Sequence, residues 1–120
     1  MYISLKKNYE FNNVFKKGKT VVGRELSLHY LNNKLNYNRL GFTTVRNFGH
    51  VVAKNRKRRL LREAYRQLDP QVKQGYDLVL MGRITNYESN FHTVYADLKK
   101  LLKKAQLLED RWVISEWCIY

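Results

Sequence analysis

The chain has 120 residues, of which 44% are hydrophobic, and this is enough for one domain with its own core. Its 23 Lys and Arg residues outnumber 10 Asp and Glu residues, and the resulting net charge of +13 predicts a polyanionic partner, with nucleic acid favoured over an anionic membrane surface. The single cysteine excludes an intrachain disulfide and a zinc site built on thiolates. Since the sequence shows neither an 18-residue apolar run nor a signal peptide, we expect a cytoplasmic protein with no membrane partner.

A short helix over residues 9–17 is the first predicted element. Asn8 is of a residue type that caps helix N-termini, and Gly18 stands where a left-handed residue ends many helices. The apolar face of this helix consists of Phe11, Val14 and Phe15, which are three and four residues apart.

Two alternating segments follow and predict strands. Apolar positions recur at every second residue towards the end of residues 20–31, and Gly23 marks a bulge or a break, so this segment forms one or two strands. Residues 32–38 are rich in turn-forming Asn, and residues 39–46 alternate again. We therefore expect residues 20–31 and 39–46 to pair as a β-hairpin.

The densest charge cluster runs from Arg46 to Arg66 and contains eight Lys or Arg residues but one acid, Glu63. Apolar residues recur inside it at helical spacing and Pro70 ends the pattern, which predicts a helix over about residues 51–69. The apolar arc of this helix comprises Leu60, Leu61, Ala64, Tyr65 and Leu68. The opposite arc, about 160° wide, comprises Asn55, Arg56, Arg58, Arg59, Arg62 and Arg66.

The charges on this helix favour an external anion over a merely solvated surface. Arg58, Arg62 and Arg66 are like charges four residues apart, which weakens an isolated helix, whereas solvated helices interleave opposite charges. Guanidinium groups also match phosphate oxygens with paired N–H donors. Lys57 falls within the apolar arc, and we expect its ammonium group to reach water along the flexible stem.

The C-terminal part predicts a strand followed by a long helix. Residues 77–81 form an apolar run bounded by glycines, which indicates a buried strand near the centre of the sheet. Residues 85–88 have the spacing of a capping box, and a helix is predicted over residues 86–108. Residues 109–120 form an apolar tail that either extends this helix, folds back on the domain or serves association.

The sequence shows no recognisable catalytic constellation. His29, His50 and His92 have no metal-ligand spacing, so we predict no metal site. The six glycines are scattered rather than gathered in a phosphate-binding loop. We therefore predict no catalytic residue in the polypeptide itself.

Several ordered motifs make the chain similar to the bacterial ribonuclease P protein family. Lys54, Asn55 and Arg56 stand at the place of its RNR signature, at the start of the basic helix. The matching segments are residues 11–18, 40–49, 54–66 and 76–83, within a resemblance that covers about residues 5–105. The order and spacing of these motifs make the resemblance specific.

The resemblance implies a single α+β domain over residues 1–108, similar to some ribosomal proteins, with a four-stranded sheet, three helices and a left-handed βαβ crossover. It also implies that the protein binds the catalytic RNA of ribonuclease P, the endoribonuclease that removes the 5′ leader from precursor tRNA. The RNA and its Mg²⁺ ions would perform the hydrolysis. We therefore expect no cofactor held tightly by the protein and no obligate protein partner.

Family roles are carried over residue by residue. The residues expected to contact the catalytic RNA are Lys54, Asn55, Arg56, Arg58, Arg59, Arg62 and Arg66. Those expected to contact the 5′ leader, in a cleft between the first helix and the sheet, are Phe11, Phe15, Thr43, Arg46 and Arg83. The alternative role is core packing for the two phenylalanines and simple surface charge for the last two arginines.

Two other functional classes compete with this interpretation. One is a ribosomal or ribosome-assembly RNA-binding protein, and the other is a DNA-binding regulator with its basic helix in a major groove. The joint presence of Phe11, Phe15 and the RNR-like helix favours ribonuclease P. The chain departs from the family pattern at Lys54, where the family usually has Arg, and at Lys57, where it usually has an aliphatic residue.

Overall fold

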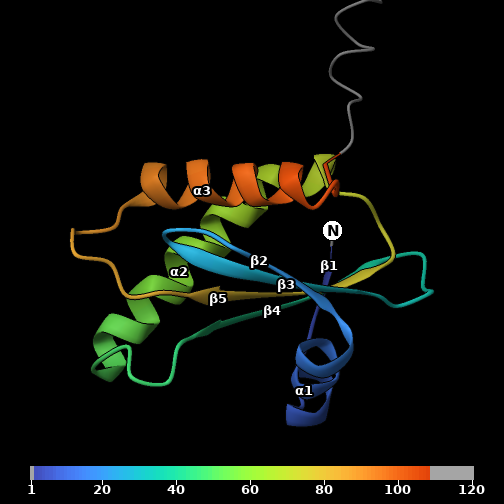
Figure 1. Cartoon of the computed structure of the whole chain (residues 1–120), viewed down its shortest axis with the longest axis horizontal. Coiled ribbons are helices and arrows are strands. Elements are labelled where there is room, and N and C mark those ends of the chain that lie inside the picture. Colours follow the sequence, from blue (N-terminus) through green and yellow to red (C-terminus); the bar gives the residue numbers. More distant parts are fainter. Residues whose placement is uncertain (1, 109–120) are drawn as a thin grey trace, which may run out of the picture.

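The computed structural model describes residues 2–108 and contains a five-stranded mixed sheet with three α-helices (Figure 1). The strands are β1 (Tyr2–Ser4), β2 (Lys19–Val22), β3 (Leu26–Asn32), β4 (Asn38–Thr44) and β5 (Tyr76–Gly82). The helices are α1 (Asn8–Lys17), α2 (Val51–Leu68), the short 3-10 helix η1 (Asp69–Gln71) and α3 (Phe91–Lys104). The predicted α+β class with three α-helices is confirmed. Within the described part of the chain, no helix has the length and apolar character needed to cross a bilayer.

The sheet differs from the prediction in its strand number and its pairing. Its order is β1-β4-β5-β3-β2, so it has five strands rather than four. The additional strand is β1, which was not predicted because it has only three residues and shows no recognisable alternation. The predicted hairpin between residues 20–31 and 39–46 is wrong, since β5 lies between β3 and β4. The hairpin is instead β2–β3, which confirms the break at Gly23. Parallel strands β4 and β5 are joined through α2.

Burial on both faces places β5 at the centre, as predicted. Leu78 and Leu80 belong to the large apolar cluster that packs against α2 and α3. Val79, between them, packs on the other face with Val14 of α1 and with Leu5. A strand with no solvated face is stable where both edges are hydrogen-bonded, and β5 pairs antiparallel with β3 and parallel with β4.

Helix α3 is shorter at both ends than the predicted residues 86–108, whereas α1 and α2 each lie within one residue of their predicted limits. The predicted capping box at residues 85–88 lies in a loop, and α3 is capped by Asn90, whose side chain accepts from the backbone N–H of Thr93 at 3.0 Å. The N-cap of α1 is Lys7 rather than Asn8. Gly18 is extended rather than left-handed, and it is required because a Cβ there would lie 2.5 Å from the carbonyl oxygen of Tyr30. The tail at residues 109–120 lies outside the described residues.

Lys57 is buried, so the expectation that its ammonium group reaches water is wrong. Its side chain is 3% exposed, and its Nζ donates to Glu25 Oε1 and, at 3.1 Å, to the hydroxyl of Ser89. The stem packs on Gly82, where a Cβ would lie 2.7 Å from Lys57 Cγ. Burial is therefore possible because the end of β5 has no side chain at the place where α2 crosses it.

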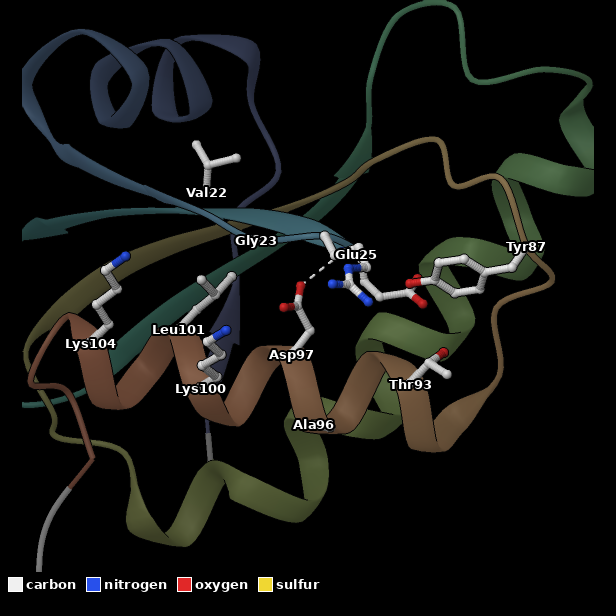
Figure 2. Close-up of a pocket in the computed structure, with 11 residues that line it drawn as sticks. Val22, Gly23, Glu25, Tyr87, Thr93, Ala96, Asp97, Lys100, Leu101 and Lys104 are labelled. Atoms are coloured by element: carbon white, nitrogen blue, oxygen red, sulfur yellow. Dashed lines mark hydrogen bonds between the residues drawn. The ribbon is translucent and has the colours of Figure 1, made fainter.

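Glu25, the acidic member of this ion pair, also contacts α3. Its backbone N–H donates to the carboxylate of Asp97 at 2.8 Å, across the cavity shown in Figure 2. Burial alone would raise the pKa of Glu25, but hydrogen bonds from Lys57 and Ser89 outweigh burial and hold its pKa below the usual value of 4.5. Because the pKa of Glu25 is lowered in the folded state, its ionised carboxylate stabilises the fold. This contribution to the free energy of unfolding is complete above about pH 4.5 and is lost as the pH falls through the lowered pKa.

We expect Lys57→Met to lower the free energy of unfolding by about 3–5 kcal/mol, because it leaves the buried carboxylate of Glu25 without its cation. The double variant Glu25→Gln/Lys57→Met should recover much of this loss, since neither side chain is then charged. Urea denaturation at pH 7, followed by far-ultraviolet circular dichroism, measures both changes. A double variant no more stable than Lys57→Met would contradict this account of the pair.

Candidate nucleic-acid interface

Helix α2 turns most of its arginines to solvent because its other side is needed for the core. Leu61, Ala64, Tyr65 and Leu68 are buried, as predicted from their spacing. The opposite side forms what we call the arginine surface, which consists of Asn55, Arg56, Arg58, Arg59, Arg62 and Arg66. Lys54 is half-buried at the start of this surface.

The arginines of this surface differ in how far the protein already engages them. Arg56 pairs with Glu88 at 3.1 Å, and both side chains remain more than half exposed. Arg58 donates to the side-chain oxygen of Asn55 at 3.0 Å, and the guanidinium of Arg62 lies 5.5 Å from the ring centre of Phe42. Within residues 2–108, no hydrogen bond or ion pair engages the side chains of Arg59 and Arg66, so their guanidinium donors remain available.

A groove lies between α1 and the sheet, where the sequence predicts a cleft. Its volume is about 550 Å³. The lining residues are Asn8, Phe11, Asn12, Phe15, Phe42, Thr43, Arg58 and Met81. Arg58 reaches the groove from α2, so the groove and the arginine surface are continuous.

The two phenylalanines of the groove have different roles in the packing. Phe11 is half-buried and covers Gly41, where a Cβ would lie 2.4 Å from its ring. Phe15 is 37% exposed, and its ring meets that of His29 edge to face at a centroid distance of 4.8 Å. Burial lowers the pKa of His29, so this imidazole is neutral at pH 7 and offers an aromatic rather than a charged surface.

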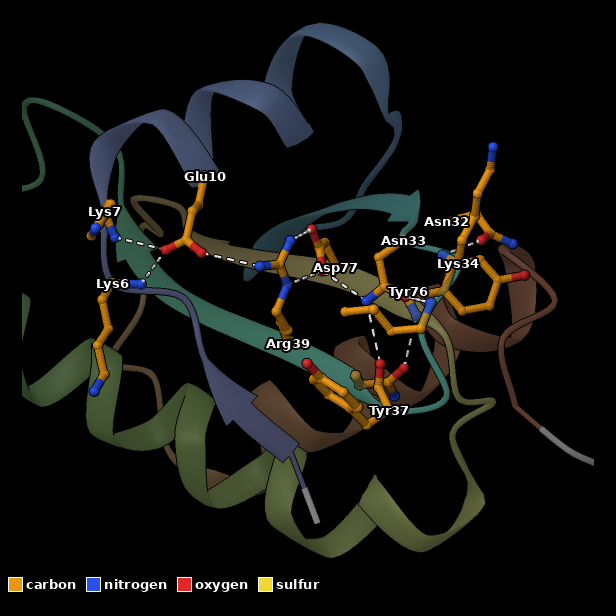
Figure 3. A network of polar contacts seen from close by, with 12 residues as sticks. Lys6, Lys7, Glu10, Asn32, Asn33, Lys34, Tyr37, Arg39, Tyr76 and Asp77 are labelled. Atoms are coloured by element: carbon orange, nitrogen blue, oxygen red, sulfur yellow. Dashed lines mark hydrogen bonds and ion pairs between the residues drawn. The ribbon is translucent and has the colours of Figure 1, made fainter.

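A polar network holds α1 over the sheet and thereby fixes the width of the groove (Figure 3). Arg39 of β4 donates two hydrogen bonds to buried Asp77 of β5, at 2.8 and 2.6 Å. Its third donor reaches Glu10 of α1 at 3.1 Å. Backbone N–H groups of Lys7 and Lys6, followed by Arg39, lower the pKa of Glu10, while hydrogen bonding to Asp77 raises the pKa of Arg39. Both carboxylates on this face are thus engaged in structure.

Only part of the predicted leader site lines the groove. Thr43 is present with the two phenylalanines, but Arg46 and Arg83 are exposed elsewhere. The guanidinium of Arg83 donates to the carbonyl of Gly23 at 2.6 Å and so supports the β2–β3 turn.

Sequence reasoning did not predict four of the groove residues as site residues: Asn8, Asn12, Phe42 and Met81. Period-two alternation along β5 would have found Met81, since Val79 and Met81 share the face that carries α1.

The donor groups of the described residues do not suit a divalent cation at this interface. The groove offers two amides, a hydroxyl and a guanidinium, and no carboxylate lines it. Within residues 2–108, no three His, Cys, Asp or Glu side chains gather as a metal site requires. Mg²⁺ prefers carboxylate oxygens, and Arg58 repels it.

The sequence of this chain is similar to curated ribonuclease P protein components. The profile of the Ribonuclease P family matches residues 2–106. The ribonuclease P protein component of Natranaerobius thermophilus is 41% identical over 107 residues, which cover 89% of this chain and 93% of the relative. That of Caldanaerobacter subterraneus is also 41% identical, over 89% of this chain and 92% of the relative.

Solved structures agree with the sequence relatives. The Staphylococcus aureus RNase P protein superposes with a TM-score of 0.78 at 25% identity, over 88% of this chain and 97% of that one. The Thermotoga maritima RNase P protein gives a TM-score of 0.74 at 28% identity, over 84% and 96%. A ribonuclease P protein component is part of an endoribonuclease complex with an RNA partner and has a role in tRNA processing. The chain belongs to the ribonuclease P protein family.

Proposed function

We propose that this chain binds the catalytic RNA of ribonuclease P through the arginine surface and the 5′ leader of precursor tRNA through the groove. Hydrolysis of the phosphodiester bond is left to the RNA. The protein raises the affinity of the complex for its precursor and stabilises the RNA.

The continuity of the two surfaces is the observation that supports this proposal. Arg58 belongs to the arginine surface and also lines the groove beside Thr43. An RNA bound along α2 and a single strand bound under α1 would therefore be neighbours. This arrangement suits a protein that holds a substrate strand next to a catalytic RNA.

The arginine surface suits a structured RNA because its chemistry matches phosphate oxygens. Arg59 and Arg66 are exposed and Arg62 lies over an aromatic ring, so several guanidinium forks project from one rigid helix. Each fork donates pairs of hydrogen bonds to phosphate, and the affinity gained does not depend on sequence.

The groove suits a single strand because it combines aromatic rings with polar groups. The exposed ring of Phe15, which packs edge to face against His29, offers a stacking surface, while Asn12 and Thr43 offer hydrogen bonds. Stacking on unpaired bases tolerates changes of sequence, which a protein that serves many precursors needs.

We further propose that the Mg²⁺ ions of the reaction are held mainly by the RNA. The donor set of the groove supports this proposal, because no carboxylate lines the groove. The protein assists by placing the positively charged side chains of the arginine surface near RNA phosphates.

The proposed function predicts that this chain enhances cleavage of precursor tRNA by a bacterial ribonuclease P RNA at low Mg²⁺ concentration. The expected result is faster removal of the 5′ leader with the protein than without it, measured under single-turnover conditions. An equal rate with and without the protein would contradict the proposal.

Arg59→Ala should weaken binding of the catalytic RNA, because Arg59 is exposed and its donors are available. The slope of log K against log salt should decrease by about 0.7–0.9, the value of one phosphate contact. The control is Lys103→Ala, which removes one charge from the exposed end of α3. Equal slopes for the two variants would mean that Arg59 remains in contact with solvent and does not bind an RNA phosphate.

Phe15→Ala should weaken binding of precursor tRNA without affecting mature tRNA, because its ring is available to leader bases. The expected loss is about 1 kcal/mol or more, the lower end of the range for stacking of one base. Tyr9→Ala is a matched control, since Tyr9 is an exposed aromatic residue of α1 that does not line the groove. Equal losses for precursor and mature tRNA would instead indicate a structural role for Phe15.

A further inference from the structure

Four lysines from separate segments line one cavity, which we call the lysine pocket. They are Lys17 at the end of α1, Lys19 at the start of β2, Lys73 before β5 and Lys104 at the end of α3. All four side chains are exposed, and the cavity has a volume of about 550 Å³. Three of these lysines lie at least 30 residues from one another, so only the fold brings them together.

The positive charge of the lysine pocket is not balanced locally. Of residues 2–108, no acidic residue lines it, and none of its four lysines forms an ion pair there. The neighbouring cavity in Figure 2, which shares Lys104, differs in this respect because Glu25 and Asp97 line it together with its cations. An anion bound from outside would relieve the repulsion among the lysines of the pocket.

The remaining lining of the pocket suits a nucleic acid strand better than a small inorganic ion. Tyr30 and Tyr76 lie in adjacent strands with their rings edge to face, at a centroid distance of 6.5 Å. The amides of Asn32 and Gln106 add uncharged donors and acceptors. Lysine ammonium groups bind phosphate as point charges, while tyrosine rings contact sugars and bases.

The lysine pocket is distinct from the groove proposed for the leader. Tyr76 in the pocket and Met81 in the groove are five residues apart on β5, which corresponds to about 17 Å along the strand. Because their positions differ by an odd number, their side chains point to opposite faces of the sheet. The pocket and the groove share no lining residue.

We propose that the lysine pocket is a third RNA-binding site, which takes backbone phosphates of an RNA segment beyond those at the arginine surface and the groove. This inference rests on the proposed function only in that RNA is the partner. Both the catalytic RNA and a long 5′ leader carry the phosphates that the pocket binds, and the experiment separates these two sources.

The test compares Lys17→Gln/Lys104→Gln with the control Lys16→Gln/Lys103→Gln. Both variants remove two charges from the last turns of the same two helices, so net charge and helix-dipole effects are matched. Only the first pair lines the pocket. One arm measures binding of the catalytic RNA alone, and the other measures binding of precursor tRNA with short and long leaders to the assembled complex.

The expected result is a decrease of about 1.4 in the slope of log K against log salt for the pocket variant, two single-strand contacts at about 0.7 each. For the control variant, the slope should decrease by less than half as much. If the slope decreases in the arm that contains only the catalytic RNA, the pocket binds that RNA. If it decreases only with long-leader precursor tRNA, the pocket binds the leader.

Identical slopes for the pocket variant and the control in both arms would overturn the inference while leaving the proposed function intact. A wild-type chain that binds neither RNA would overturn the proposed function and, with it, the inference. Thermal unfolding of both variants checks that the exposed substitutions leave the fold intact.

Discussion

A buried ion pair fixes helix α2 to the sheet, and the placement of the arginine surface depends on it. Lys57 donates to Glu25 and Ser89, so α2, the β2–β3 turn and the loop before α3 meet at one point. The pair is possible because Gly82 leaves room for the lysine stem. An aliphatic residue at position 57 would fill the same space but would leave Glu25 without a cation, so these two positions are coupled.

The acidic residues of this basic chain are used largely for structure. Glu10 and Asp77 both bind Arg39, and Asp97 accepts from the backbone of the β2–β3 turn. The groove and the lysine pocket are consequently lined by cations and neutral groups without carboxylates. Phosphates can therefore approach the cations of these two sites without meeting an acidic side chain in the lining.

Periodicity predicted those parts of the fold that depend on one element at a time. It gave α2 within one residue at its C-terminal end and four of its five buried residues, because the facing of a helix follows from the spacing of its own apolar residues. It failed for the pairing of β3 with β4, because strand order depends on β5, more than 30 residues further along the chain. At the groove, the family resemblance predicted Phe11, Phe15 and Thr43, and nothing in the sequence reasoning predicted Met81.

The sequence by itself determined the charge, the helix that carries the arginines and the family, through motifs in a fixed order. Only the tertiary structure decided that Lys57 is buried, that Arg58 reaches the groove and that four lysines share one pocket. The physical reason is that periodicity records which side of an element is apolar, whereas the environment of a charged side chain is set by other elements. Lys57 and Glu25 are 32 residues apart, and no local pattern connects them.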